Sequence, residues 1–220
     1  YKSVDGGENW YNINGNENTF VGRLAGFNNT TGSSNTFIGK GAGHANTITA
    51  GNTFIGARAG GVNTVANNTF VGADAGMVNT IGTGNTFIGK GAGDVNTTAI
   101  DNTFVGADAG GANVIGTGNT FLGAAAGDVN TASSNTFIGA NAGGANTSAS
   151  DNTFIGMRAG LVNVTGTSNT FIGARAGDSN TASGNTFIGK DAGQANTTGT
   201  LNTYIGSDSG SGNSTSTKNT

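Results

Sequence analysis

The chain of 220 residues contains no proline and no cysteine, and it has only one histidine and one tryptophan. The absence of cysteine excludes disulfide bonds and thiolate metal sites. The absence of proline excludes collagen-like and proline-rich linker classes, and it leaves every backbone N–H able to join a hydrogen-bond ladder. Charged residues make up 10% of the chain, against about 25% in ordinary globular domains. The composition is therefore not that of an ordinary globular domain.

The formal net charge of −3 is small and is spread along the chain. No basic track exists that could follow a nucleic acid, so we expect no nucleic-acid partner. No run of 18 or more apolar residues occurs, so the sequence predicts no membrane span. The chain does not begin with methionine and stops in the middle of a repeat. We therefore expect it to be a piece of a longer or processed protein.

Glycine is abundant, at 42 of 220 residues, and a short motif recurs at a fixed period. The tripeptide Asn-Thr-aromatic occurs twelve times with steps of 16 or 17 residues, and a thirteenth copy is cut off at the end. A repeat this short cannot bury a core of its own, so neighbouring repeats must stack on one another. The twelve copies begin at Asn18, Asn35, Asn52, Asn68, Asn85, Asn102, Asn119, Asn135, Asn152, Asn169, Asn185 and Asn202.

Positions within a repeat are counted from its first asparagine. Asparagine stands at positions 1 and 12, threonine at 2, an aromatic residue at 3, an aliphatic residue at 4, and glycine at 5 and 9. Positions 1 to 5 predict a strand of about five residues, because β-branched and aromatic types dominate there. A second, weaker extended segment is predicted at positions 11 to 13. Glycine at positions 5 and 9 predicts positive φ angles, or close backbone approach, at corners of the coil.

Charges and length differences are confined to particular positions. Within the repeats every Asp, Lys and Arg stands at position 6, 7, 10 or the last position, and the one-residue length difference falls after position 13. This distribution predicts buried strands and solvent-facing corners, with a turn at positions 14 to 17. We therefore predict an all-β fold, a β-solenoid or β-roll of twelve coils of 16 or 17 residues, with two or three short strands in each coil. Stacking would place asparagine above asparagine in amide ladders and phenylalanine above phenylalanine in a column.

The alternation of side chains along a strand decides which residues face inward. Position 3 points to one side and positions 2 and 4 to the other, and we place the aromatic residues in the interior. The opposite orientation, with the aliphatic residues inside and the aromatic column outside, is the alternative. The predicted core ladder consists of Phe20, Phe37, Phe54, Phe70, Phe87, Phe104, Phe121, Phe137, Phe154, Phe171, Phe187 and Tyr204.

The aliphatic residues at position 4 would then form an outward apolar stripe. A stripe of that length exceeds what monomers usually expose, and such patches mark sites of association. We therefore predict that several chains pack their stripes together, as a trimer or a filament. Either orientation of the strand predicts association. The predicted self-association ladder consists of Val21, Ile38, Ile55, Val71, Ile88, Val105, Leu122, Ile138, Ile155, Ile172, Ile188 and Ile205.

The unit Asn-Thr-Phe-Ile-Gly-x-x-Ala-Gly-x-x-Asn-Thr resembles the short repeats of bacterial surface fibres and phage tail fibres. It is similar to the head repeats of trimeric autotransporter adhesins, in which an Asn-Ser-Val-Ala-Ile-Gly type of strand builds a trimeric left-handed parallel β-roll. The resemblance covers residues 18–220, although the period of 16 or 17 residues is longer than that of the adhesin heads. It implies an extracellular, cell-surface or virion-surface stalk or adhesin, often trimeric, and it implies no catalytic residue.

Residues 1–17 stand apart from the repeats and contain Trp10, the only tryptophan. The segment from Ser3 to Trp10 resembles an Asp-box, a β-hairpin motif in which Asp5 and Gly6 would shape the turn and the tryptophan would pack. We interpret residues 1–17 either as the tail of an upstream domain or as a cap over the first coil. Residues 18–220 form the repeat shaft.

Catalytic and ligand-binding motifs are scarce. His44 is the sole histidine and has no recurring partner, so a role as a general base is not favoured. Asp74 and Asp208 share one corner of the coil with Arg58 and Arg158 of other repeats. A corner of mixed charge is typical of a solvated face rather than of a calcium site. No calcium nonapeptide and no phosphate-binding loop occur. We therefore expect no enzyme activity, no metal and no cofactor.

The sequence accordingly predicts a structural protein, the self-associating shaft of an extracellular fibre or adhesin stalk. Corner residues that vary between coils, such as Phe27, Met77, Leu161 and Arg158, are places where a host or cell-surface ligand could be contacted. The alternative is a monomeric ligand-binding solenoid. In that case threonine at position 2 and the aliphatic residue at position 4 would form a flat, two-row Thr-x-Ile face, which could order water and bind ice.

Overall fold

The computed structural model describes residues 2–3, 10–11 and 17–220. Its regular secondary structure consists of β-strands, and no helix occurs in the part of the chain that is described. The chain forms two compact units, Tyr1–Ile115 and Gly116–Thr220. Each unit contains six of the predicted repeats, and the two units are described separately below.

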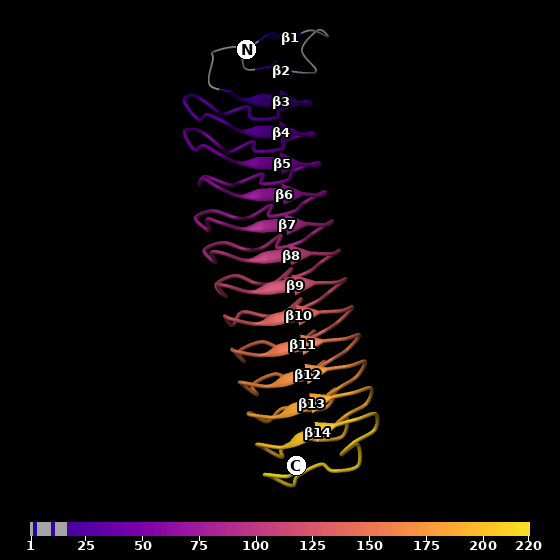
Figure 1. The fold of residues 1–220 in the computed structure, drawn as a ribbon. Helices are drawn as coiled ribbons and strands as arrows, with labels where there is room; N and C mark the ends of the chain where they lie inside the picture. The colour runs from indigo at the N-terminus through magenta and orange to yellow at the C-terminus, as the bar shows by residue number, and fades with distance from the viewer. Residues whose placement is uncertain (1, 4–9, 12–16) are drawn as a thin grey trace. The chain divides into compact units, whose positions relative to one another are not determined.

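In the first unit each repeat contributes one strand of three residues to a parallel sheet, and the strands follow one another in chain order (Figure 1). Threonine pairs with threonine, and phenylalanine with phenylalanine, from each strand to the next. These strands are β3 (Thr19–Val21), β4 (Thr36–Ile38), β5 (Thr53–Ile55), β6 (Thr69–Val71), β7 (Thr86–Ile88) and β8 (Thr103–Val105).

The second unit has the same construction. Its strands pair in parallel and without any shift between equivalent positions, so that Tyr204 of the last repeat lies beside Phe187. These strands are β9 (Thr120–Leu122), β10 (Thr136–Ile138), β11 (Thr153–Ile155), β12 (Thr170–Ile172), β13 (Thr186–Ile188) and β14 (Thr203–Ile205).

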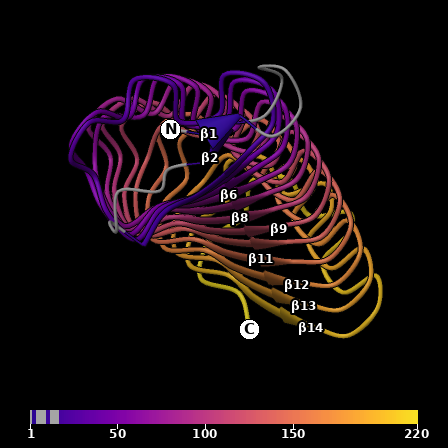
Figure 2. The same cartoon turned by 90° about the horizontal axis from the view of Figure 1, so that it is seen from above.

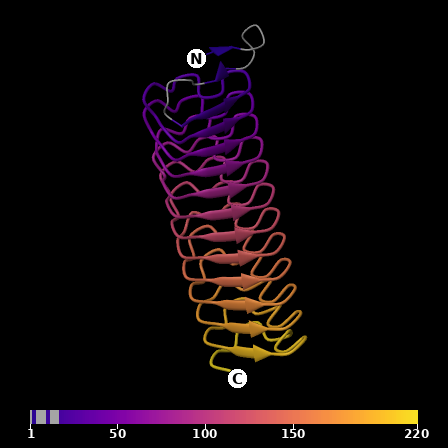
Figure 3. The same ribbon diagram turned by 45° about the horizontal axis from the view of Figure 1, so that its top comes forward.

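The predicted all-β solenoid is thus confirmed, but the predicted number of strands per coil is wrong. Each repeat makes one turn around a buried interior (Figure 2) and contributes a single strand, on the same side of the coils within each unit (Figure 3). The predicted five-residue strand is only three residues long, and positions 11 to 13 form no strand in the described repeats.

The strand ends early because the glycine at position 5 leaves the extended conformation. All twelve of these glycines have φ between 118° and 143°, which residues with a side chain rarely adopt. A Cβ on Gly56 would also lie 2.3 Å from the carbonyl oxygen of Gly72 in the next coil. Conformation and close approach of two backbones therefore both require glycine, as the repeat pattern predicted.

Positions 11 to 13 are held between coils without forming a strand. In the first unit the backbone N–H of Ala45 donates to Gly61 over 3.0 Å, and that of Val62 donates to Met77 over 3.0 Å. Further hydrogen bonds link the coils at positions 7 and 9, for example from Gly43 to Ala59 over 3.0 Å. Each coil is therefore tied to its neighbour around its whole circumference, mostly by turn residues.

The interior of each unit is a column of stacked aromatic rings. In the first unit neighbouring ring centroids lie 4.8–5.0 Å apart and the ring planes differ by at most 9°. The second unit has the same arrangement, and its last step joins Phe187 to Tyr204 at 5.1 Å. All eleven phenylalanines of these columns are fully buried, whereas Phe27, which lies outside them, is 58% exposed. Burial of each ring contributes about 1.5–3 kcal/mol, so these columns are the main apolar core.

The asparagine at position 1 closes its own coil and joins it to the next. The side-chain oxygen of Asn35 accepts a hydrogen bond from the backbone N–H of Asn52 over 3.0 Å. Its Nδ2 donates to the carbonyl oxygen of Thr49, at the far end of the same coil, over 2.8 Å. The short amide of asparagine supplies an acceptor and a donor at separate atoms, and both are used here, which agrees with asparagine at this position in every repeat. The predicted amide ladder is found at position 12, where Asn79 Nδ2 donates to Asn63 Oδ1 over 2.6 Å, whereas Asn35 at position 1 bonds to backbone groups.

The N-terminal segment contains two short strands, β1 (Lys2–Ser3) and β2 (Trp10–Tyr11), which pair antiparallel. Ser3 is opposite Trp10 in this pair. The residues between them, which carry the Asp-box resemblance, lie outside the described residues. The interpretation of residues 1–17 as a cap or a domain tail stays a prediction.

Candidate association face

The outward side of the strands carries two rows of side chains in each unit. Threonine at position 2 forms the threonine row and the residue at position 4 forms the aliphatic row, and both point away from the buried aromatic column. We call these two rows together the association face. Adjacent side chains in a row are about 4.8 Å apart, and the two rows are about 7 Å apart. No charged residue stands in either row.

The structure places every residue of the predicted self-association ladder in the aliphatic row. All twelve are half-buried or exposed in the single chain, and the exposed fractions of Ile55, Ile88 and Leu122 are 36%, 40% and 45%. The aromatic residues of the predicted core ladder are buried instead. The strand therefore has the orientation with phenylalanine inside, and the opposite orientation is not observed.

The threonine row carries hydroxyl groups that have no partner within the described part of the chain. A second threonine row, at position 13, differs in this respect. The hydroxyl of Thr64 donates to the carbonyl oxygen of Thr80 over 2.8 Å, and that of Thr131 donates to Thr147 over 2.7 Å. The position 13 hydroxyls are thus used to join coils, whereas those of the threonine row remain able to bond to an external partner.

The sequence predicts the aliphatic row as the association site and does not predict a part for the threonine row in it. The free hydroxyls could not be recognised, because threonine stands at positions 2 and 13 alike. Only the hydrogen bonds between coils distinguish the two rows.

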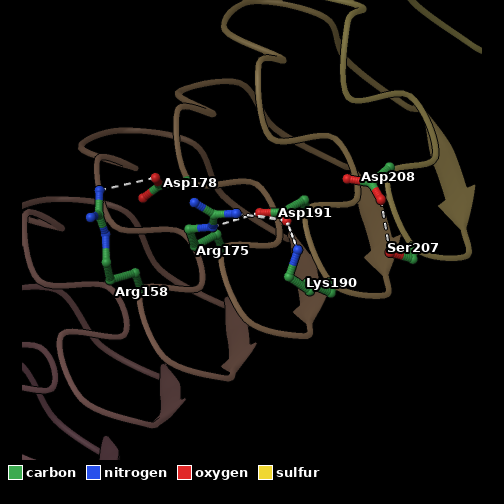
Figure 4. Close-up of polar contacts among 7 residues, drawn as sticks. All are labelled: Arg158, Arg175, Asp178, Lys190, Asp191, Ser207 and Asp208. Atoms are coloured by element: carbon green, nitrogen blue, oxygen red, sulfur yellow. Dashed lines mark hydrogen bonds and ion pairs between the residues drawn. The ribbon is translucent and has the colours of Figure 1, made fainter.

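Charged side chains at positions 6, 7 and 10 of the second unit form two neighbouring groups of ion pairs, which we call together the charged cluster (Figure 4). Arg175 Nε lies 2.6 Å from Asp191 Oδ1, and Lys190 Nζ lies 2.5 Å from the other oxygen of that carboxylate. Arg158 has Arg175 as its neighbour in the next coil, and its guanidinium reaches instead to Asp178 at 3.1 Å. Because the neighbour at position 7 is also basic, Arg158 pairs with the acidic residue at position 10 of the next coil.

Asp178 and Asp191 are buried, with exposed fractions of 8% and 2%. The prediction that all charges face solvent at the corners is wrong for these two residues, because the long basic side chains of Arg158, Arg175 and Lys190 cover the carboxylates. Hydrogen bonds from Arg175 and Lys190 lower the pKa of Asp191. The hydrogen bond to Asp191 in turn raises the pKa of Arg175. This cluster ties three coils together.

The corners also hold side chains in an unusual backbone conformation. All twelve residues at position 7 have φ between 52° and 69°, and they include Leu24, Arg58 and Ala125. Arg58 Nε lies 2.6 Å from Asp74 Oδ1, and this hydrogen-bonded pair raises the pKa of Arg58. No sequence pattern indicates these left-handed residues, because the position is glycine in only two repeats.

The described residues contain no group of three or more His, Asp or Glu side chains placed to hold a metal ion. His44 stacks on Phe27 with ring centroids 5.7 Å apart, on the outside of the coils. In the same part of the chain no helix has the length and apolar character needed to cross a membrane.

No protein-family model, no curated protein sequence and no solved structure matches this chain.

Proposed function

We propose that the chain is a structural protein, a shaft segment of an extracellular fibre or adhesin stalk at a cell or virion surface. Copies of the chain associate through the association face into a trimer or a filament. The role of the protein is to form a rigid rod, and it carries out no catalysis. Variable corner residues such as Phe27 and Met77 are where contacts to a host or cell-surface ligand would be added. The observation that carries this proposal is the half-buried or exposed aliphatic row beside a row of hydroxyls that have no partner in the described part of the chain.

The absence of charge on the face favours a second copy as its partner. Two association faces brought together would bury aliphatic side chains without burying any ion, so no desolvation of charge opposes the contact. Burial of apolar area is the main driving force of protein association. The hydroxyls of the threonine row can hydrogen-bond to groups on the partner, which avoids the cost of burying them unpaired.

The spacing of the rows also favours a second copy. Side chains repeat about every 4.8 Å along the face, which is the distance between hydrogen-bonded strands. A second copy has the same repeat, so its side chains can fit between those of the first along the whole length of a unit. The length differences between repeats fall in the turns after position 13, away from the strands, and do not disturb this match.

The test is the mass of the purified chain in solution, measured by light scattering after size-exclusion chromatography. We expect an oligomer that resists heating in SDS. Replacement of Ile55 and Ile88 by aspartate should give a monomer, because a carboxylate in the face would be buried on association. The control replaces Ile48 and Ile81, which are 67% and 60% exposed and lie at position 14, by aspartate. That variant should remain an oligomer, and a wild-type chain that is monomeric would refute the proposal.

A second candidate function uses the same face without a second copy. The unpaired hydroxyls and the methyl groups form a regular two-dimensional array, which is suited to ordering water and binding ice as a monomer. Thermal hysteresis of a solution in which the chain is monomeric would favour this function over the shaft. Loss of that hysteresis on replacement of Thr53 and Thr86 by valine would assign it to the threonine row.

A further inference from the structure

The association face of the first unit is bordered by two rows of opposite charge. The residue before position 1 stands near the threonine end of each strand, and the residue at position 6 stands near its aliphatic end. In residues 17–115 the border beside the threonine row contains two acidic residues and no basic one, and the border beside the aliphatic row contains basic residues and no acidic one. The acidic border consists of Glu17 and Asp101, and the basic border consists of Arg23, Lys40 and Lys90.

These charged groups are available to a partner. All five residues are exposed, and none of them forms an ion pair with another described residue. The carboxylate of Glu17 accepts one hydrogen bond, from the hydroxyl of Ser34 over 3.3 Å. Arg58 and Asp74 of the same unit are paired with each other instead. The five charges of the two borders therefore remain available at the two ends of the strands.

Symmetry limits how two such faces can meet. If the two chains run parallel and are related by an axis along the coils, the threonine side of one face meets the aliphatic side of the other. If they run antiparallel, the threonine side meets the threonine side and the aliphatic side meets the aliphatic side. The acidic border therefore meets the basic border only in the parallel arrangement, and this holds for a two-fold axis as well as for a three-fold axis.

The positions of the individual charges give the same result. In a parallel pair without any shift along the axis, Glu17 meets Arg23 of the same coil, and Asp101 meets Lys90 of the adjacent coil, about 4.8 Å away along the axis. When two antiparallel faces overlap fully, the first coil of one faces the sixth of the other. Glu17 then faces Asp101, and Lys40 faces Lys90, so like charges oppose each other at both borders.

We infer that copies of the chain associate in parallel and without a shift along the axis, with the acidic border of one first unit against the basic border of the next. The inference rests on the proposed function, whose face it uses. Exposed ion pairs contribute little to affinity. Their effect is on the choice of orientation, because like charges placed opposite one another are excluded.

Cross-linking between copies can test the orientation, since the chain has no cysteine of its own. Full-length Glu17→Cys chains that carry an affinity tag are mixed with untagged Arg23→Cys chains, allowed to assemble together and treated with a short bis-maleimide. The parallel arrangement predicts a tagged–untagged product. Untagged Ala73→Cys is the matched control, because Ala73 also occupies position 6 and lies three coils away. We expect several-fold less product with it.

Two further mixtures of cysteine variants distinguish the parallel arrangement from the antiparallel one. Asp101→Cys with Lys90→Cys should also cross-link, whereas Glu17→Cys with Asp101→Cys should not. Product from the last mixture, or an oligomer that gives no product from the first two, would overturn the parallel arrangement while leaving the proposed function intact. A monomeric chain would reject both. As a second measurement, NaCl screens the charges of the borders, so it should reduce the preference for the first two mixtures over the last one. A preference that is unchanged by salt would contradict the role of the borders.

Discussion

Phe37 and Gly43 of one coil lie so close that a Cβ on the glycine would be 2.6 Å from the phenyl ring. Gly43 also has φ of 58°, a conformation that favours glycine. The same contact recurs between positions 3 and 9 in the other repeats, for example between Phe104 and Gly110 at 2.5 Å. The aromatic column can therefore fit inside so small a coil only where the opposite wall has no side chain.

Replacement of Gly43 by alanine should lower the free energy of unfolding by about 2–5 kcal/mol, because left-handed strain and overpacking against Phe37 add together. The matched control is Gly41→Ala. Gly41 has φ of 69°, but a Cβ there would meet nothing within 4 Å. That variant should lose only about 1–2 kcal/mol, the cost of the strain. Urea unfolding followed by circular dichroism measures both, and equal losses would show that the ring contact has no effect.

Replacement of Asn52 by aspartate should destabilise the coil strongly at neutral pH. Asn52 Nδ2 donates to the carbonyl oxygen of Val65 over 2.9 Å, and the side chain is fully buried. A carboxylate would place a buried charge against that oxygen, at a cost of roughly 2–4 kcal/mol. This environment would raise the pKa of the new carboxyl, so the loss should be relieved as the pH falls and a proton restores the donor. Unfolding of the variant and the wild type at pH 7 and at low pH would show whether the difference shrinks.

The ion pairs of Asp191 should make part of the stability dependent on pH. Hydrogen bonds from Arg175 and Lys190 lower its pKa in the folded chain, so the folded state holds this proton less tightly than the unfolded state. The resulting stability is fully present above the unfolded pKa, about 3.9, and is lost as the pH falls through the lower folded pKa. Asp191→Asn should therefore be less stable than wild type at neutral pH, and the difference should disappear in acid.

Asp108→Asn is the control for this prediction, because Asp108 occupies the same position of the coil, is exposed, and forms no ion pair with another described residue. Its unfolding midpoint should change little between neutral and acid pH relative to wild type. A pH dependence of the same size in both variants would mean that the pairing of Asp191 is not its source.

The exposed pair of Arg58 and Asp74 should contribute much less. The Arg58 side chain is 65% exposed, and exposed ion pairs are worth about 0–1 kcal/mol. Asp74→Asn, which keeps a residue type that tolerates left-handed φ, should lower stability within that range in dilute buffer. The effect should vanish in concentrated salt, and thermal unfolding at two salt concentrations checks it. A large loss that persists in salt would show that Asp74 has a structural role beyond the pair.

Much of the fold follows from the repeat itself. The alternation at positions 2 to 4 predicts which side of each strand is buried, and Phe54 lies inside while Ile55 lies outside as expected. Glycine at positions 5 and 9 predicts the corners, since glycine adopts positive φ at the least cost. The fixed period predicts stacking of like on like, which the paired strands and aromatic rings confirm within each unit.

Other features depend on residues that are far apart in the sequence. The closing bond of each coil joins Asn35 to a carbonyl group 14 residues later, and no local pattern reveals it. Left-handed residues at position 7 are tolerated because the stacked coils fix the backbone there, whatever the side chain. The burial of Asp191 depends on Arg175 in the preceding coil.

The sequence by itself thus determined the period, the solenoid and the inward ring, because these are set by residue types that recur at every repeat. Tertiary structure decided which threonine hydroxyls are free, which carboxylates are covered and how each coil is closed. Those properties depend on the coil above or below, and contacts between coils are fixed only when the chain has wound on itself.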